Sequence, residues 1–309
     1  MASPLDHLRG MVICLPWLIW IFISDILLSA LLPFFQLAPD TCYRLASSLA
    51  WSGWSWIQVI FTTFNGAVIT VSGDILPHGE SAIVVANHVS WCDFYMIQAL
   101  ALPAGMLGRC RYFAKTQLKW VPFLGWGLWA MGMPLVTRRW DRDQKELDRV
   151  FAGIVERRWP TWLVSFSEAT RYTPAKYKDS IAWCAEHDKP QPLHLLYPRT
   201  KGFVTTVQHL RKAPHVKAVY DLAIAYQKGP EFRSTPSMWE TLSAPHLSDP
   251  KSKGGEGYRF HVHVRRFPLI ELPTTDDELV KWLEARWVEK GLWLEQKRLE
   301  WAKESSQIE

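Results

Sequence analysis

Five short apolar runs, separated by longer and more polar segments, restrict the fold of this 309-residue chain most strongly. Because a parallel strand is buried on both faces, its sequence is a near-continuous apolar run without polar alternation. The segments between the runs could form helices. The pattern therefore predicts an α/β domain with a mostly parallel sheet flanked by helices. The five runs are Ile83–Ala86, Met133–Thr137, Trp162–Phe166, His194–Tyr197 and Val216–Tyr226.

The C-terminal part of the chain shows two other patterns. Apolar and polar residues alternate over 258–265, which predicts a strand with one exposed face. His261 and His263 share one face of that strand, but no third metal ligand is near, so we expect surface histidines and no metal site. After Thr275 the periodicity becomes helical and predicts a capped helix, broken into two near Gly291.

The N-terminal part predicts contact with a membrane. Residues 11–32 are almost entirely apolar and long enough to span a bilayer, although Pro16 and Asp25 interrupt them. Residues 45–64 are amphipathic and contain several of the chain's 18 tryptophans, a residue favoured at membrane interfaces. We expect a two-helix apolar hairpin in residues 1–65, which spans or dips into the bilayer, followed by the α/β domain in residues 66–309. A cleaved signal peptide and a helical cap on a soluble core remain alternatives.

Composition narrows the classes of function. The net charge of +5 suits a phosphate-bearing substrate or an anionic membrane surface, and by itself it is not typical of nucleic-acid binding. The five cysteines form no CxxC pair, so we expect reduced thiols and neither a disulfide framework nor a zinc ribbon. The chain contains neither GxxxxGK nor GxGxxG, which argues against nucleotide-binding enzymes.

The sequence NHVSWCD follows the first apolar run and contains a candidate catalytic pair. His88 and Asp93 are five residues apart, so on one continuous helix their side chains would point away from each other. They can meet if His88 lies in the loop after the strand and Asp93 in the first helical turn. Asp93 would then orient the imidazole, and Nε2 could act as a base. Two alternatives remain: simple helix capping by these residues, and a nucleophilic role for Ser90 or Cys92.

Basic side chains follow several of the predicted strands. In an open parallel sheet the ligand lies outside the carboxyl ends of the strands. Cations gathered there suit a phosphate ester, which arginine can grip with two hydrogen bonds. The residues concerned are Lys115, Arg138, Arg139, Arg171, Arg199 and Lys201.

Four ordered blocks of the sequence together resemble a known family. The blocks are NHVSWCD, FLGWGLWAMGMPLVTRRW, SEATR and LLYPRTKGF. The chain resembles the glycerolipid acyltransferases, also called 1-acylglycerol-3-phosphate or lysophospholipid acyltransferases, over roughly residues 75–295. The likeness is greatest to the eukaryotic branch with a PRTKGF block. The resemblance implies acyl transfer from acyl-CoA, as co-substrate and without a further cofactor, to the free hydroxyl of a membrane lysophospholipid.

The resemblance also implies roles for individual residues. His88 is expected to be the general base and Asp93 its orienting partner. The other blocks are expected to bind substrate, and their candidate residues are Lys115, Arg138, Glu168, Thr170, Arg171, Pro198, Arg199 and Lys201. The third block of the family usually reads Glu-Gly-Thr-Arg, and here Ala169 replaces the glycine. If that position requires a positive φ, the alanine strains the backbone.

We expect 1-acylglycerol-3-phosphate as the substrate, which would give phosphatidic acid, and we expect the protein at the endoplasmic reticulum membrane. Three alternatives remain open. The first is a remodelling enzyme for lysophosphatidylinositol or another lysophospholipid, and the second is a CoA-independent transacylase. The third is a lipid-binding protein without catalytic activity. The sequence does not indicate the oligomeric state.

Overall fold

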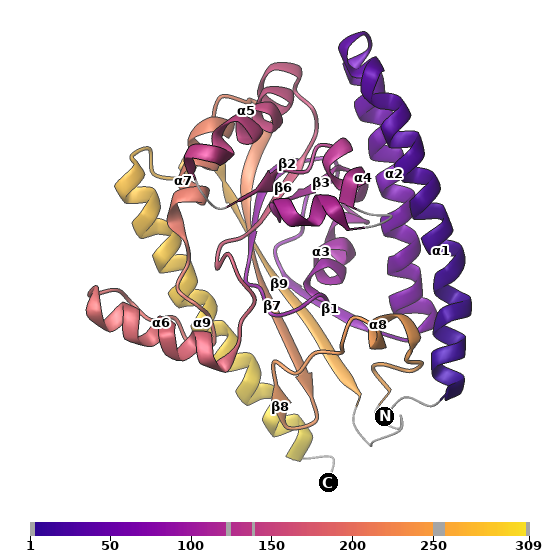
Figure 1. Ribbon diagram of the computed structural model, residues 1–309. Helices are drawn as coiled ribbons and strands as arrows, with labels where there is room; N and C mark the ends of the chain where they lie inside the picture. Colours follow the sequence, from indigo (N-terminus) through magenta and orange to yellow (C-terminus); the bar gives the residue numbers. More distant parts are fainter. Residues whose placement is uncertain (1–3, 122–124, 138–139, 250–256, 307–309) are drawn as a thin grey trace.

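The structure is a computed structural model that describes residues 4–121, 125–137, 140–249 and 257–306. Its centre is a twisted sheet with the strand order β1-β9-β7-β2-β6-β3 (Figure 1). All neighbouring pairs in this order are parallel except β7 and β9, which confirms the predicted mostly parallel sheet. The strands are β1 (Ile69–Gly73), β2 (Ser81–Ala86), β3 (Cys110–Tyr112), β6 (Trp162–Phe166), β7 (Val216–Lys228) and β9 (Tyr258–Pro268).

Three shorter strands lie outside this order. The two-residue strand β8 (Glu231–Phe232) pairs with the end of β7. The strands β4 (Ala114–Lys115) and β5 (Leu135–Val136) form a small separate sheet. The apolar run Met133–Thr137 thus contains a strand, but that strand does not join the central sheet.

Helices cover both faces of the central sheet, and alternate residues of β2 divide between two apolar cores. Val84 faces the core beneath α1 to α3, whereas Ile83 and Val85 face the core beneath α5, α7 and α9 (Figure 1). This division explains why the strand sequence has no polar alternation. The helices are α1 (Pro4–Leu31), α2 (Pro39–Val59), α3 (Asp93–Ala101), α4 (Gly125–Ala130), α5 (Trp140–Arg157), α6 (Pro174–Glu186), α7 (Thr200–Leu210), α8 (Glu240–Ser243) and α9 (Asp276–Ser306).

The two N-terminal helices differ in character. The segment from α1 to the following 3-10 turn, Pro4–Gln36, contains an 18-residue stretch with a mean hydropathy of 2.3 and is long and apolar enough to cross a membrane. Within the described ranges it is the one such helix. The inner face of α2 contributes Ala46, Ala50 and Ile57 to the core of the α/β domain. The sequence-based expectation of an apolar two-helix hairpin is therefore supported for α1, while α2 is partly a core helix.

Two elements differ from the sequence-based expectation. Residues 194–197 form a turn and not a strand, and the C-terminal region is one continuous helix rather than two. Gly291 does not break α9. A β-carbon at this position would lie 2.7 Å from the backbone of Leu193, so the glycine allows a close approach between the turn and the helix.

The histidines of β9 are less exposed than their alternating pattern indicates. His261 is buried, and its ring nitrogens lie 2.6 Å from Thr70 Oγ1 and 2.8 Å from Ser72 Oγ. His263 stacks on Trp293 of α9, with ring centroids 4.7 Å apart. The prediction of surface histidines was wrong for His261, because the C-terminal helix covers the face that the strand pattern leaves polar.

Candidate active site

The loop after β2 is fixed to the neighbouring strand by one buried amide. The Asn87 side chain donates to the Ile224 carbonyl at 3.0 Å, and the Ile224 N–H donates to Asn87 Oδ1 at 2.8 Å. These two bonds continue the β2–β7 pairing through a side chain after the strand has ended at Ala86. The backbone is then free to turn, and His88 stands at the carboxyl edge of the sheet.

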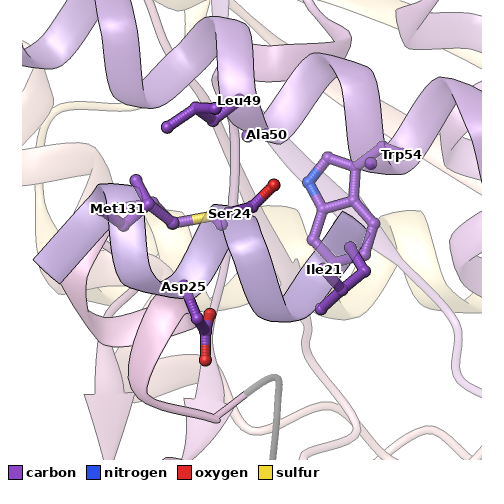
Figure 2. A pocket seen from close by; sticks show the side chains of 9 residues that line it. Ile21, Ser24, Asp25, Leu49, Ala50, Trp54 and Met131 are labelled. Carbon is purple, nitrogen blue, oxygen red and sulfur yellow. The ribbon is translucent and has the colours of Figure 1, made fainter. Parts of the chain in front are cut away.

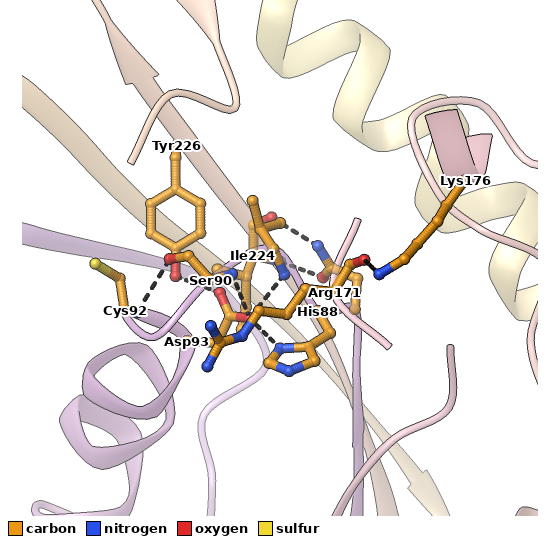
Figure 3. A network of polar contacts seen from close by, with 10 residues as sticks. His88, Ser90, Cys92, Asp93, Arg171, Lys176, Ile224 and Tyr226 are labelled. Atoms are coloured by element: carbon orange, nitrogen blue, oxygen red, sulfur yellow. Dashed lines mark hydrogen bonds and ion pairs between the residues drawn. The ribbon is translucent and has the colours of Figure 1, made fainter. Parts of the chain in front are cut away.

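His88 and Asp93 meet across this loop. His88 Nδ1 lies 2.7 Å from Asp93 Oδ2 (Figure 3). The same oxygen accepts the backbone N–H groups of Val89, at 2.7 Å, and Ser90, at 3.1 Å. The other oxygen accepts the phenol of Tyr226 at 2.7 Å. Four hydrogen-bond donors therefore hold the Asp93 carboxylate in one position. His88 lies in the loop, and Asp93 is the first residue of α3.

The imidazole of His88 is oriented by a ring contact on one face and by the Asp93 carboxylate at one edge. Its ring stacks on Phe166 of β6, with centroids 4.1 Å apart and planes at 16°. Because the Asp93 carboxylate accepts at Nδ1, we assign the proton to Nδ1, which leaves the lone pair on Nε2. Nε2 has no hydrogen-bond partner among the described residues, and the side chain is 15% exposed. The geometry is that of a general base open to a substrate hydroxyl.

The neighbouring thiol and hydroxyl do not form a nucleophilic site. Cys92 is buried, and its Sγ points to the Pro236 carbonyl at 3.6 Å. Burial raises the pKa of this thiol to about 12, so it carries no thiolate near neutral pH. Ser90 Oγ accepts the Cys92 N–H at 3.0 Å and so closes the loop. These positions argue for direct attack by a substrate and against a covalent acyl-enzyme.

The third and fourth sequence blocks lie against the dyad loop. The Tyr172 N–H, directly after the third block, donates to the His88 carbonyl at 2.8 Å. The Arg199 N–H of the fourth block donates to the Ser167 carbonyl at 2.6 Å. Backbone bonds thus join three segments that are far apart in the sequence, and they bring Glu168, Thr170, Arg171, Pro198 and Arg199 to the edge of the sheet that carries the dyad.

A lysine that the sequence blocks do not include joins this edge. Lys176, in the first turns of α6, donates to Thr170 Oγ1 at 2.7 Å and to the Arg171 carbonyl at 3.1 Å (Figure 3). Arg171 itself is exposed. Arg171 and Lys176 therefore place two cations on the third block.

Ala169 has a left-handed backbone conformation, with φ of 56°. Its N–H donates to the Phe166 carbonyl at 2.8 Å, which closes the turn after β6. Glycine adopts this conformation without steric cost, whereas alanine pays about 1–2 kcal/mol. The position thus meets the condition under which the missing glycine strains the backbone.

Glu168 is a second buried carboxylate at the site. It is 3% exposed, and neither carboxylate oxygen has a hydrogen bond of normal geometry among the described residues. Burial raises the pKa of this carboxyl well above its usual range. The backbone N–H groups of His88 and Leu196 lie close enough to lower the pKa in part. Glu168 therefore lies directly behind the loop that carries the dyad.

The remaining candidates are not all brought to the dyad. Lys115 is exposed on the small β4–β5 sheet, and no contact with His88 or Asp93 is recorded for it in the part of the chain that the structure describes. Lys201 is exposed in the first turn of α7. Arg138 and Arg139 lie outside the described residues. No group of three or more His, Cys, Asp and Glu side chains within the described ranges could hold a metal ion.

Sequence reasoning missed three residues that shape the dyad. Tyr226 and Asn87 hold the carboxylate and the loop, and Phe166 stacks on the imidazole. Asn87 is the first residue of the block NHVSWCD, and Phe166 directly precedes the block SEATR, so their positions in the sequence could have indicated both residues. Tyr226 lies 133 residues after Asp93, and only the β2–β7 pairing brings the two together.

A small cavity lies between α1 and α2, away from the dyad (Figure 2). Its lining includes Ile21, Ser24, Asp25 and Trp54, and its volume of about 20 Å³ holds one water molecule at most. It is too small for an acyl chain. The carboxylate of Asp25 reaches instead toward α4, where a β-carbon on Gly127 would lie 1.8 Å from it.

Comparison with known proteins agrees with this combination of sheet and dyad. Residues 68–227 match the acyltransferase family model, and residues 253–296 match a model described as the acyltransferase C-terminus. The chain therefore belongs to the acyltransferase family, which confirms the resemblance found in the sequence.

Individual relatives refine this assignment. The probable 1-acyl-sn-glycerol-3-phosphate acyltransferase 5 of Arabidopsis thaliana is 31% identical over 74% of this chain and 57% of its own length. The 1-acyl-sn-glycerol-3-phosphate acyltransferase delta of Bos taurus is 31% identical over 70% of this chain and 53% of its own length. The chain thus spans little more than half the length of these relatives.

One solved structure is similar to this chain over most of its length. It is the crystal structure of the 1-acyl-sn-glycerophosphate (LPA) acyltransferase PlsC from Thermotoga maritima. The likeness has a TM-score of 0.48 and 15% sequence identity, and it covers 94% of this chain and 98% of that chain.

Proposed function

We propose that the protein transfers an acyl group from acyl-CoA to the free hydroxyl of a lysophospholipid, with His88 as general base. The observation that carries the proposal is the dyad geometry: Nδ1 is bonded to a fully held carboxylate, and Nε2 is open. A hydroxyl is a weak nucleophile at neutral pH, so it needs a base at the moment of attack. The described residues near the dyad offer no competing nucleophile, since Cys92 is buried and protonated.

The reaction follows from these positions. The hydroxyl oxygen attacks the thioester carbonyl while Nε2 takes the hydroxyl proton. Asp93 stabilises the resulting imidazolium through Nδ1–H. The tetrahedral intermediate collapses, the carbon–sulfur bond breaks, and the imidazolium returns the proton to the leaving sulfur of CoA. The products are a phospholipid ester and free CoA, and no cofactor is consumed.

The proposed acceptor is 1-acyl-sn-glycerol 3-phosphate, which gives phosphatidic acid. Arg171 and Lys176 supply two cations on the third block, which suits a phosphate monoester. The relatives carry the same substrate in their names. Thr170, Pro198, Arg199 and Lys201 are proposed to line the same region, and Lys115 and Arg138 are also proposed to bind substrate.

The proposed location is a membrane surface, where the acceptor resides. α1 is long and apolar enough to span a bilayer, and most of its apolar side chains face outward. We propose that α1, together with the outward face of α2, anchors the catalytic domain to the endoplasmic reticulum membrane. This arrangement would place the dyad between lysolipid in the leaflet and acyl-CoA in the water.

The experiment is acyl transfer by purified, detergent-solubilised protein from radiolabelled acyl-CoA to a panel of lysophospholipids. Wild-type protein is expected to acylate lysophosphatidic acid, and His88→Ala to lose at least about 100-fold in turnover. His187→Ala is the matched control, since His187 is exposed at the end of α6. Equal activity of wild-type and His88→Ala protein would refute the dyad.

The panel also separates the alternatives. Transfer to lysophosphatidylinositol alone would make the protein a remodelling enzyme with the same chemistry. Transfer from a phospholipid without acyl-CoA would make it a transacylase. The strained Ala169, in place of the family's usual glycine, is the observation that favours testing other acceptors. No transfer to any acceptor would favour a lipid-binding protein without catalytic activity.

A further inference from the structure

A hairpin at the end of β7 brings a further arginine to the dyad. The strand β8 pairs with the last residues of β7, and Arg233 directly follows it (Figure 1). The Arg233 N–H donates to the Tyr226 carbonyl at 2.7 Å, and the phenol of the same tyrosine donates to Asp93. Arg233 lies between residues 68–227 and 253–296, the two regions that match the family models. Neither these models nor the four sequence blocks therefore assign it a role.

The guanidinium of Arg233 lies over an aromatic ring next to the third block. Its Cζ is 3.9 Å from the ring centroid of Tyr172, the residue that directly follows that block. The Tyr172 N–H donates to the His88 carbonyl at 2.8 Å. Two chains of direct contacts, one through Tyr226 and one through Tyr172, thus connect Arg233 with the dyad.

Arg233 differs from the arginines of the C-terminal elements because it has no carboxylate partner. Among the described residues it forms no ion pair, and its side chain has one hydrogen bond, of 3.4 Å, to the His194 carbonyl. All five arginines of β9 and α9 pair with a carboxylate: Arg259, Arg265, Arg266, Arg286 and Arg298. The Arg233 side chain is half-buried, and a guanidinium stacked on a ring can still donate from its edge.

The backbone of Arg233 is strained. Its φ of 69° is left-handed, a conformation that is unfavourable for most residues with a β-carbon. Glycine would relieve the strain but would supply no guanidinium. Strained backbone persists where the surrounding structure holds it, and it clusters at ligand sites. The strain therefore agrees with a role for the side chain beyond closing the hairpin.

The cations gathered here suit a phosphate monoester. Arg171 and Lys176 lie on the third block, and Arg233 lies over the ring of the next residue. A phosphate monoester carries about 1.5–2 negative charges at pH 7 and three strong acceptor oxygens. A guanidinium fork matches two such oxygens, and an ammonium supplies a point charge.

We propose that Arg233 binds a phosphate monoester of a substrate. Its guanidinium, oriented by the ring of Tyr172, donates two hydrogen bonds to the phosphate oxygens. Two substrates of the proposed reaction carry such a group, namely lysophosphatidic acid and, on its ribose, acyl-CoA. The identity of these ligands rests on the proposed function, whereas phosphate-dependent binding through Arg233 can be measured without turnover.

The test is equilibrium binding to the full chain in nonionic detergent, with His88→Ala present to prevent turnover. Two pairs of probes differ in the phosphate monoester alone: lysophosphatidic acid against the monoacylglycerol of the same chain, and CoA against dephospho-CoA. Arg233→Gln should weaken binding of the phosphate-bearing member of one pair by at least about tenfold, the usual weight of hydrogen bonds to a charged group. Binding of the phosphate-free member should change by less than about twofold.

The two pairs identify the source of the phosphate. A selective loss for lysophosphatidic acid assigns Arg233 to the acceptor, and a selective loss for CoA assigns it to the donor. No loss, or an equal loss for both members of each pair, would overturn the proposal. If Arg233→Gln does not fold, Arg233→Asn is the second variant, because asparagine tolerates a left-handed backbone.

The matched control is Arg259→Gln. Arg259 also lies over an aromatic ring, with Cζ 5.9 Å from the ring centroid of Trp301, but it pairs with Glu304 at 2.6 Å. This variant removes the same charge and should change binding of every probe by less than about twofold. A selective loss as large as that of Arg233→Gln would mean that any missing positive charge weakens phosphate binding, and it would refute a specific role for Arg233.

The ring beneath the guanidinium gives a second test. Tyr172→Phe keeps the ring and should bind the phosphate-bearing probe as wild type does, whereas Tyr172→Leu should lose part of that affinity. In an Arg233→Gln background, Tyr172→Leu should weaken binding further by less than about twofold. Losses that multiply would show that the ring does not act through Arg233, and they would contradict the proposed arrangement.

Initial rates of acyl transfer separate this proposal from the proposed function. In an active protein, Arg233→Gln should raise KM for the assigned substrate by at least about tenfold and leave kcat within about threefold. A fall in kcat at unchanged KM would refute substrate binding by Arg233. A protein without acyl transfer whose phosphate-dependent binding still requires Arg233 would refute the proposed function and keep the phosphate site.

Discussion

Asp93 and Glu168 are two buried carboxylates at the ends of neighbouring strands, and they are held in opposite ways. Asp93 accepts four hydrogen bonds, from His88, Val89, Ser90 and Tyr226. Glu168 accepts none of normal geometry among the described residues, and burial raises the pKa of its carboxyl well above the usual range. Both sit within one site.

The difference shows what each carboxylate can do. A carboxylate with four donors is held in one position, which suits the orientation of an imidazole. Burial without such donors raises the pKa of the Glu168 carboxyl, so the folded protein binds its proton more tightly than a free glutamate would. Asp93 is therefore expected to act through geometry, and Glu168 through the proton that it binds. The predictions that follow test this distinction.

The largest effect is expected for Asp93→Asn. An amide has nearly the same shape and can still accept at one oxygen, but it carries no charge to stabilise the imidazolium. Turnover should fall by about 10²–10⁴-fold with the protein still folded. Initial rates of acyl transfer measure the loss, and the melting temperature in detergent checks the fold. Turnover within tenfold of wild type would show that the charge of Asp93 has no catalytic role.

A smaller loss of activity is expected for Glu168→Gln, together with a pH-dependent change in stability. The raised pKa means that the folded state binds the Glu168 proton more tightly than the unfolded chain does. Stability of the wild type therefore falls as pH rises from the ordinary glutamate range toward the raised pKa. The variant lacks this penalty. Its melting temperature should exceed that of wild type, by a margin that grows from pH 5 to pH 8, while turnover falls by at least about tenfold.

Glu80→Gln is the control, and its effect on stability should change with pH in the opposite direction. Burial would raise the pKa of Glu80, but bonds from Arg266 and Tyr220 outweigh it and leave the pKa lowered. A lowered pKa gives stability that is present at neutral pH and lost as pH falls through the folded pKa. Glu80→Gln should therefore destabilise most at neutral pH and least in acid. If the stability of both variants changed with pH in the same direction relative to wild type, the distinction between the two kinds of carboxylate would be contradicted.

A still smaller effect on activity is expected for Tyr226→Phe. The change removes one of the four donors to Asp93 and leaves the other three, so turnover should fall by a few-fold. The buried hydrogen bond to a charged group contributes about 1.5–3 kcal/mol to stability. Tyr220→Phe is the matched control, because Tyr220 lies on the same strand and donates to the Glu80 carboxylate at 2.6 Å. It should cost similar stability and leave turnover unchanged.

Equal turnover losses in the two tyrosine variants would mean that damage to β7, and not release of Asp93, causes the effect. Activity lost in Tyr226→Phe alone would place Tyr226 with Asp93 as a positioning residue.

The sheet and the dyad could be predicted because their signals are local. The apolar pattern predicts buried strands at Ile83–Ala86 and Trp162–Phe166, and the structure has a strand at each of these places. At a spacing of five residues, the side chains of His88 and Asp93 can meet only if His88 lies in a loop and Asp93 lies in the helical turn that follows it. Each of these signals lies within about ten residues, where the backbone alone decides which side chains can meet.

The support for the site could not be predicted because it comes from long-range contacts. Tyr226 reaches Asp93 across the β2–β7 pairing, 133 residues further along the chain. The burial of His261 likewise depends on α9, which no pattern within the strand reveals. Sequence periodicity gives the face of a strand but not the element that covers it.

The smallest effect is expected for Ala169→Gly, beside Glu168 in the same turn. The alanine has a φ of 56°, and relief of this strain should stabilise by about 1–2 kcal/mol. The greater freedom of glycine in the unfolded chain offsets roughly 0.5–1 kcal/mol. The net gain should be about 0.5 kcal/mol, read as a small rise in melting temperature.

Ala182→Gly is the control, at an exposed position within α6 where glycine should destabilise by about 0.5–1 kcal/mol. Opposite signs for the two alanine-to-glycine changes would locate the strain in the third block. If Ala169→Gly also changes the choice of lysophospholipid while Ala182→Gly does not, the alanine methyl group contributes to substrate selection. A destabilised Ala169→Gly variant would instead show that the turn needs the stiffness of alanine, and that Glu168 depends on backbone geometry as much as Asp93 does.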